Sequence, residues 1–211
     1  MKKALLAAYG GTETTESAVM NGLEWLKRNQ GRDGMWSLTG NYSQGAPTEN
    51  REDATAMALL AFQGHGSTHK FGPYQAVVAR GWNALIKKQD DEGNFFFTGG
   101  FHHNLYTHAQ ATIALCELYG MTRDETLKAP AEKALSYCLS SQSPQGGWRY
   151  LPGGASDTSV TGWFVMALQS GRMAGLTVPI ANLNRISGYL DTATTDAGIR
   201  YAYQPGQSDT L

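Results

Sequence analysis

The stretch QGRDGMW at residues 30–36 returns as QDDEGNF at 89–95 and as QSPQGGW at 142–148. Each copy has a glutamine, a glycine four residues later and an aromatic residue two positions after the glycine. The glutamines are 59 and 53 residues apart, and a weaker copy at 194–201 has threonine in the glutamine position. Copies at a nearly constant spacing predict a repeat protein with one structural unit per repeat. The predicted structural positions are Gln30, Gly34, Trp36, Gln89, Gly93, Phe95, Gln142, Gly146 and Trp148.

Each copy lies at the end of a segment with the apolar periodicity of an amphipathic helix. In residues 131–139, for example, apolar side chains recur at the i, i+3, i+4 and i+7 positions. Pro73, Pro130 and Pro179 stand near three of the predicted starts, where a helix tolerates proline. We therefore expect outer, amphipathic helices at residues 16–29, 74–88, 131–141 and 180–192.

A second set of segments alternates with these and has no polar stripe. Residues 54–62 read ATAMALLAF, and residues 109–119 and 158–168 are similar. A helix that is apolar on all sides is buried on all sides. Gly64, Gly120 and Gly171 stand near the predicted ends, where glycine is a common stop signal. We expect inner helices at 52–63, 105–119 and 158–170.

The alternation predicts an all-α fold in two layers, with about three and a half helical-hairpin repeats in a single domain over residues 1–211. Hydrophobic residues make up 41% of the chain and charged residues 17%, as in a globular protein. The net charge of −1 comes from scattered side chains, which argues against nucleic acid as a partner. No apolar run approaches the roughly 20 residues of a membrane-spanning helix.

The repeat resembles the QW motif of squalene and oxidosqualene cyclases. Arg80-Gly81 and Lys133-Ala134 match the opening of that motif, upstream of the glutamine. The resemblance implies a member of the terpenoid-cyclase and protein-prenyltransferase superfamily, an α/α toroid in which the glutamine caps a neighbouring helix. More narrowly, GGWRY at 146–150 and SDTSVTGW at 156–163 look like the prenyltransferase/squalene-oxidase repeat proteins of planctomycete bacteria.

A closed ring in that superfamily needs more helices than the three inner and four outer helices expected here. The chain is therefore either a piece of a longer ring or chain, which we favour, or an open arc. The last outer helix lacks an inner partner, so Ile180, Leu183, Ile186 and Leu190 need cover. Weak self-association through this open edge, a following segment, or the tail 196–211 folding back would each supply it.

The catalytic residues of the superfamily are not found. Class II cyclases use an Asp-x-Asp-Asp motif, and the nearest match, REDATA at 51–56, keeps only Asp53. A lone carboxylate lacks the neighbours that would make it a strong acid. No Asp-x-Cys pair matches the zinc ligands of protein prenyltransferases, so we expect no metal and no cofactor. Cys116 and Cys138 fall inside predicted helices, in apolar surroundings, and are interpreted as reduced core thiols. This favours the cytoplasm without fixing the compartment.

One group of polar residues remains as a candidate site at one end of the predicted ring. Asp53, His108 and Asp157 each lie near the N-terminus of an inner helix, and in register they would face one mouth of the central cavity. The competing interpretation is helix capping, by the box Thr107-x-x-Gln110 and by Ser156 or Asp157. The candidate cavity-mouth residues are Glu52, Asp53, Tyr106, His108, Gln110, Asp157 and Trp163, with Ser159 close by.

Two further features bear on this mouth. The loop residues His102 and His103 are flanked by glycines and could reach over it. Trp25, Trp36, Trp82 and Trp148 belong to the repeat pattern and are interpreted as structural.

The sequence thus favours a non-catalytic binding or scaffold module with an apolar small molecule or a protein as partner. The alternative is an enzyme of isoprenoid or terpenoid metabolism that acts on an apolar substrate in the central cavity. The density of acidic side chains in the cavity separates the two, and here it is low.

Overall fold

The computed structural model describes residues 8–40, 42–97 and 99–207, and it is all-α. The α-helices are α2 (Glu13–Arg28), α3 (Arg51–Gly64), α4 (Gln75–Leu85), α5 (Asn104–Thr122), α6 (Glu125–Ser140), α7 (Thr158–Met173) and α8 (Ile180–Ala193). Short 3-10 turns are η1 (Ile86–Lys88), η2 (Phe101–His103) and η3 (Asp196–Gly198). The small antiparallel sheet pairs β1 (Thr194–Thr195) with β2 (Arg200–Tyr201).

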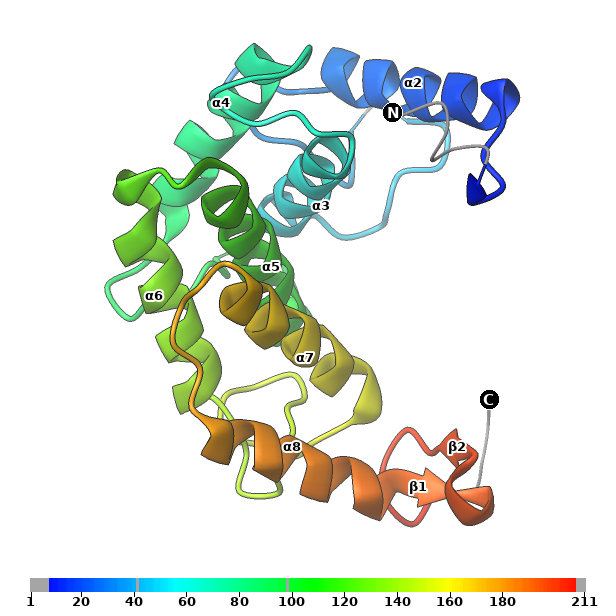
Figure 1. The fold of residues 1–211 in the computed structure, drawn as a ribbon, viewed down its shortest axis with the longest axis vertical. Helices are drawn as coiled ribbons and strands as arrows, with labels where there is room; N and C mark the ends of the chain where they lie inside the picture. The colour runs from blue at the N-terminus through cyan, green and yellow to red at the C-terminus, as the bar shows by residue number, and fades with distance from the viewer. Residues whose placement is uncertain (1–7, 41, 98, 208–211) are drawn as a thin grey trace.

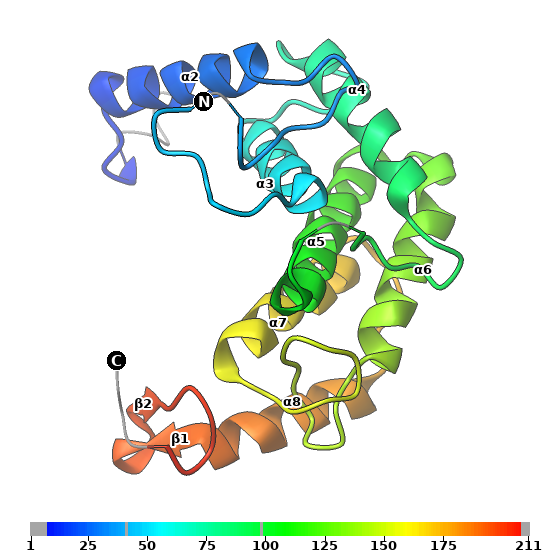
Figure 2. The same cartoon turned by 180° about the vertical axis from the view of Figure 1, so that it is seen from behind.

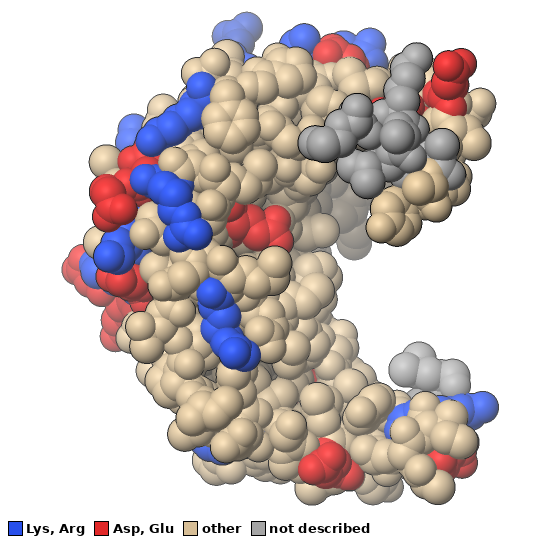
Figure 3. Space-filling view, in the orientation of Figure 1, with Lys and Arg blue, Asp and Glu red and all other residues tan. Residues whose placement is uncertain are grey.

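The helices form a C-shaped arc in two layers (Figures 1 and 2). Helices α3, α5 and α7 pack side by side along the inner side, α4 and α6 cover the outer side, and α2 and α8 form the two ends. Helix α5 is the centre of the core, because nearly every residue from Leu105 to Tyr119 is buried. In Figure 3 charged side chains gather along the outer edge of the arc, over α4 and α6, while the surface that borders the hollow is mostly uncharged.

The inner and outer helices occur in the predicted order, but three of the residues interpreted as helix boundaries lie inside helices. Helix α6 begins at Glu125, so Pro130 lies inside the helix rather than near its start. Gly120 and Gly171 also lie inside helices instead of ending them. A Cβ on Gly171 would lie 2.8 Å from the Leu135 side chain, so this glycine permits close packing of α7 against α6.

The repeat glutamines join each repeat to the next one. Gln30, Gln89 and Gln142 donate Nε2 to the carbonyl of their own repeat glycine at 2.9, 3.2 and 2.7 Å. They also donate to the carbonyls of Val77, Pro130 and Asn182 at 3.0, 2.9 and 3.1 Å. These carbonyls belong to the following outer helices α4, α6 and α8. The amide therefore bonds inside the next outer helix rather than to the free N–H groups at its start.

The repeat glycines allow that contact. Gly34, Gly93 and Gly146 have φ values of +93°, +99° and +99°, a region that favours glycine. A Cβ would lie 2.6, 2.3 and 2.2 Å from the carbonyl oxygens of Arg80, Lys133 and Arg185, again in the next outer helix. Gly198 of the weak fourth copy has a similar φ of +95°, but its nearest such neighbour is the Thr194 side chain at 3.9 Å.

The aromatic residues of the repeat are buried. Trp36 and Trp148 are 2% and 1% exposed. Their indole N–H groups donate to the carbonyls of Leu26 and Cys138, at 2.8 and 3.0 Å. Phe95 fills the same position with 0% exposure and without a donor. The indoles of Trp36 and Trp148 therefore hydrogen-bond their inter-repeat turns to the preceding helix.

The open edge is better covered than the sequence predicts. Ile186 is buried at 4% exposure, and Leu183 and Leu190 pack against the core, so only Ile180, 67% exposed, fits the predicted apolar patch. The described part of the tail folds back, because Thr158 donates its backbone N–H to the Tyr203 carbonyl at 2.9 Å. Residues 208–211 of that tail lie outside the described residues. Self-association through this edge stays a prediction.

Candidate functional site

A cavity of about 490 Å³ lies at the N-terminal ends of the inner helices. We call it the mouth pocket. Four of the predicted mouth residues line it, from all three inner helices: Asp53 of α3, Tyr106 and Gln110 of α5, and Trp163 of α7. His102 and His103 also line it, as their loop position suggested. The remaining wall is Leu38, Ala46, Pro47, Thr48 and Asn50.

Asp53 is the carboxylate of the mouth pocket. It lies in the first turn of α3, where the backbone N–H bonds to Asn50 Oδ1 at 3.1 Å. Its own Oδ1 is buried and has no hydrogen-bond partner among the described residues. Burial raises the pKa of Asp53 to about 6, since no nearby charge compensates the lost hydration. The side chain is therefore a weak acid that is mostly ionised above neutral pH.

The mouth pocket holds other polar groups beside this carboxylate. Tyr106 is held in place by its hydroxyl, which lies 2.7 Å from Ser159 Oγ. Burial, and secondarily the adjacent His102, lowers the pKa of His103, so this imidazole is uncharged at neutral pH. Gln110 is 8% exposed, and its Oε1 has no partner among the described residues. Asp53 thus stands among groups that offer hydrogen bonds and aromatic surface.

A second cavity of about 420 Å³ adjoins the first between α2, α3 and the loop that joins them. We call it the apolar pocket. It shares Leu38 and Ala46 with the mouth pocket, so the two cavities adjoin, and we call the pair the groove. None of its described lining residues is charged, and the ring centroids of Trp25 and Tyr42 lie 5.1 Å apart in its wall. Trp25 is 45% exposed, whereas Trp36, Trp82 and Trp148, with which the sequence pattern groups it, are buried.

Glu49 and Asn50 organise the loop that separates the two pockets, and sequence reasoning missed both. Glu49 accepts from the Leu38 backbone N–H at 2.8 Å and from the Thr39 hydroxyl at 2.8 Å. Burial opposes ionisation of Glu49, but these bonds and the one from Ser37 lower its pKa. Asn50 caps α3 and donates Nδ2 to Thr107 Oγ1 at 2.7 Å, which ties α3 to α5. The available signal was an asparagine three residues before an acidic residue at a helix start.

His108 does not reach the mouth pocket, and the prediction that it faces this mouth is wrong. It is 0% exposed, its Nε2 lies 3.1 Å from the Ala134 carbonyl, and its ring packs 4.6 Å from that of Tyr137. Burial lowers the pKa of His108 to about 4, so it is a neutral core residue. Helix geometry explains the error. Tyr106 and Gln110 are four residues apart and share a face, whereas His108 lies between them on the opposite face.

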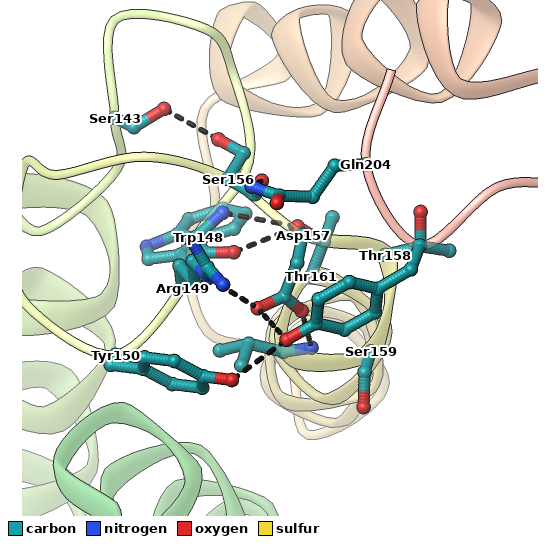
Figure 4. A network of polar contacts seen from close by, with 12 residues as sticks. Ser143, Trp148, Arg149, Tyr150, Ser156, Asp157, Thr158, Ser159, Thr161 and Gln204 are labelled. Carbon is teal, nitrogen blue, oxygen red and sulfur yellow. Dashed lines mark hydrogen bonds and ion pairs between the residues drawn. The ribbon is translucent and has the colours of Figure 1, made fainter. Parts of the chain in front are cut away.

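Asp157 is also separated from the mouth pocket. It caps α7 by accepting from the Val160 backbone N–H at 2.7 Å, which agrees with the capping interpretation. Its other oxygen accepts from the Tyr203 hydroxyl at 2.9 Å and lies 3.5 Å from Arg149 Nε, in the network drawn in Figure 4. Asp157 is 0% exposed, and its burial raises the pKa, against the hydrogen bonds, which lower it. The tail therefore covers the carboxylate that the sequence placed in the cavity.

Two smaller expectations also change. Glu52 is 1% exposed and does not line the mouth pocket. Thr107 does not cap α5, because the helix begins at Asn104 and Thr107 Oγ1 donates to the His103 carbonyl at 3.0 Å. Cys116 and Cys138 are free and buried, as expected.

The described residues show neither a metal-binding cluster nor a membrane-spanning helix. Among them, no three His, Cys, Asp or Glu side chains are grouped closely enough to hold a metal ion. None of the helices in this part of the chain has the length and hydropathy that a bilayer crossing requires. Neither a protein-family model nor a curated protein sequence matches the chain. Its function must therefore be inferred from the geometry of the groove.

Proposed function

We propose that the chain is a squalene-cyclase-like repeat domain, an open α/α toroid that binds an apolar ligand without transforming it. The observation that carries the proposal is the groove, the pair of adjoining cavities formed by the mouth pocket and the apolar pocket. Each cavity falls in the range of roughly 300–1,000 Å³ that is typical of small-molecule sites. The toroid relationship is supported by the Gln–Gly turns, which bond each repeat to the next outer helix.

The alternative, an enzyme of isoprenoid metabolism, rests on the Asp53 carboxyl. With a pKa of about 6, however, Asp53 is a far weaker acid than alkene protonation demands. No other carboxylate lines the mouth pocket within the described chain. We therefore expect no cyclised or transferred product when the protein is incubated with squalene or prenyl diphosphates. A product that disappears in Asp53→Asn would favour the enzyme.

The binding proposal is tested with straight-chain alcohols and a matched pair of methionine variants. Met57 lines the apolar pocket and is 42% exposed, whereas Met166 on α7 is 45% exposed and lines neither pocket. Calorimetry should show octan-1-ol binding more tightly than butan-1-ol, by about fourfold for each buried methylene. Met57→Lys should weaken octan-1-ol binding at least about tenfold, because a charge would enter apolar surroundings. Met166→Lys should leave it unchanged.

Two results would contradict this proposal. One is an absence of alcohol binding to the wild-type protein at millimolar concentration. The other is equal weakening by both lysine variants, which would place the apolar contact elsewhere on the inner surface, as a broad protein-binding face would require.

A further inference from the structure

The two pockets of the groove differ in their polar chemistry. In the apolar pocket, the polar members of the described lining are Ser37 and Gln44, together with the rims of Tyr42 and the indoles. In the mouth pocket, a carboxylate lines the same cavity as the rings of Tyr106 and Trp163. A groove with an uncharged compartment and a polar compartment fits an amphiphile, with its chain in the first and its head in the second.

The charge of the mouth pocket specifies that head. Asp53 is the carboxylate of its described lining, and no lysine or arginine belongs to that lining. The nearest arginine in sequence, Arg51, is already bound to Asp33 through two contacts of 2.7 and 2.9 Å. An anionic head would meet the Asp53 carboxylate without a compensating cation, and a neutral head would leave that carboxylate unpaired.

The aromatic side chains favour a cation. Trp163 and Tyr106 reach the mouth pocket from α7 and α5, and a cation is attracted to the face of such rings. The hydroxyl of Tyr106 is bonded to Ser159, which fixes the ring at the wall. A carboxylate together with two aromatic rings is a combination that recognises organic ammonium groups.

We propose that the groove binds an alkylammonium amphiphile, with the ammonium head between Asp53, Tyr106 and Trp163 and the alkyl chain in the apolar pocket. This assignment rests on the proposed binding function and names its ligand class. Near pH 7.5 the Asp53 carboxyl, whose pKa is about 6, is ionised and supplies the negative charge that the ammonium requires.

The test compares three probes with the same eight-carbon chain at about pH 7.5: octyltrimethylammonium, octan-1-ol and octyl sulfate. Calorimetry on the wild-type protein should give the ammonium an affinity about tenfold higher than that of the alcohol, with the sulfate weakest. Asp53→Asn should remove the preference for the ammonium and leave alcohol binding within about twofold, because only the charge is lost. Trp163→Leu should weaken ammonium binding by about fivefold and affect the alcohol less.

The outcomes separate this inference from the function on which it rests. Equal affinities for the ammonium and the alcohol, or an ammonium preference that survives Asp53→Asn, would overturn the head-group assignment while alcohol binding upheld the binding function. Failure of all three probes to bind would defeat the binding function itself. Circular dichroism of each variant confirms that a lost preference does not come from unfolding.

Discussion

The N-terminal ends of α3 and α7 hold equivalent positions in their repeats, but the carboxylates at these two ends have opposite environments. Asp157 at α7 is fully buried and bonded to a backbone N–H and the Tyr203 hydroxyl, beside Arg149. Asp53 at α3 faces the mouth pocket, and its buried oxygen has no partner. Part of the difference is position, because Asp157 is the N-cap of α7, whereas Asp53 lies three residues after Asn50, the N-cap of α3. The rest comes from the neighbouring chain, because the tail supplies a partner at α7 and a loop forms a cavity at α3.

The largest expected effect is at the satisfied carboxylate. Asp157→Ala should lower the free energy of unfolding by about 3 kcal/mol, since it removes the α7 cap, the acceptor of the Tyr203 hydroxyl and the carboxylate beside Arg149. Urea unfolding followed by circular dichroism measures this loss. Asp157→Asn is the matched control, because asparagine keeps the capping oxygen, and it should lose only about 1 kcal/mol. Equal losses in the two variants would mean that the charge, rather than the cap, matters at α7.

Removing the charge of the unpaired carboxylate, Asp53, should increase the free energy of unfolding rather than decrease it. The pKa of Asp53 is about 6 in the folded protein, above its ordinary value near 4 in the unfolded chain. Below both values each state is protonated, so Asp53 costs no stability. As the pH rises through this window the unfolded state releases its proton first, and above the folded pKa the full destabilisation remains.

Asp53→Asn should therefore stabilise the protein by about 2 kcal/mol near pH 7.5 and have almost no effect near pH 3.5. Urea midpoints at the two pH values measure the change. A variant that is destabilised near pH 7.5 but not near pH 3.5 would show that the ionised Asp53 carboxylate has a partner in solution, and the contrast with Asp157 would then fail.

The repeat made much of this architecture predictable. The spacing of Gln30, Gln89 and Gln142 predicted the order of inner and outer helices and the turns between them, because these contacts recur in every repeat. Contacts that occur in only one repeat could not be predicted from the repeat pattern. Pro130 and Gly171 looked like boundary signals, yet packing against neighbouring helices overrides such local preferences.

The candidate site was predictable only in part, for a geometric reason. Asp53, Tyr106, Gln110 and Trp163 share a cavity because each lies on the side of its inner helix that borders this cavity. His108 could be excluded from the cavity only by its angular position around the helix axis, and not by its position along the helix. The apolar pocket depends on how the loop 37–50 folds over α3, and its long-range hydrogen bonds through Glu49 leave no periodic pattern in the sequence.

The smallest expected effect tests whether the tail causes the difference between the two ends. Tyr203→Phe removes the hydroxyl that donates to Asp157 Oδ2 and that lies 2.8 Å from the Tyr150 hydroxyl. The aromatic packing and the backbone bond from Thr158 remain, and Arg149 still faces the carboxylate. The loss should therefore be about 1 kcal/mol, the contribution of one hydrogen bond to a charged group that keeps other partners. Tyr201→Phe is the control, because Tyr201 is 48% exposed, and it should unfold like the wild type. A Tyr203→Phe protein as stable as its control would mean that Asp157 is satisfied without the tail, so that the loop beside α3, rather than the tail beside α7, sets the two carboxylates apart.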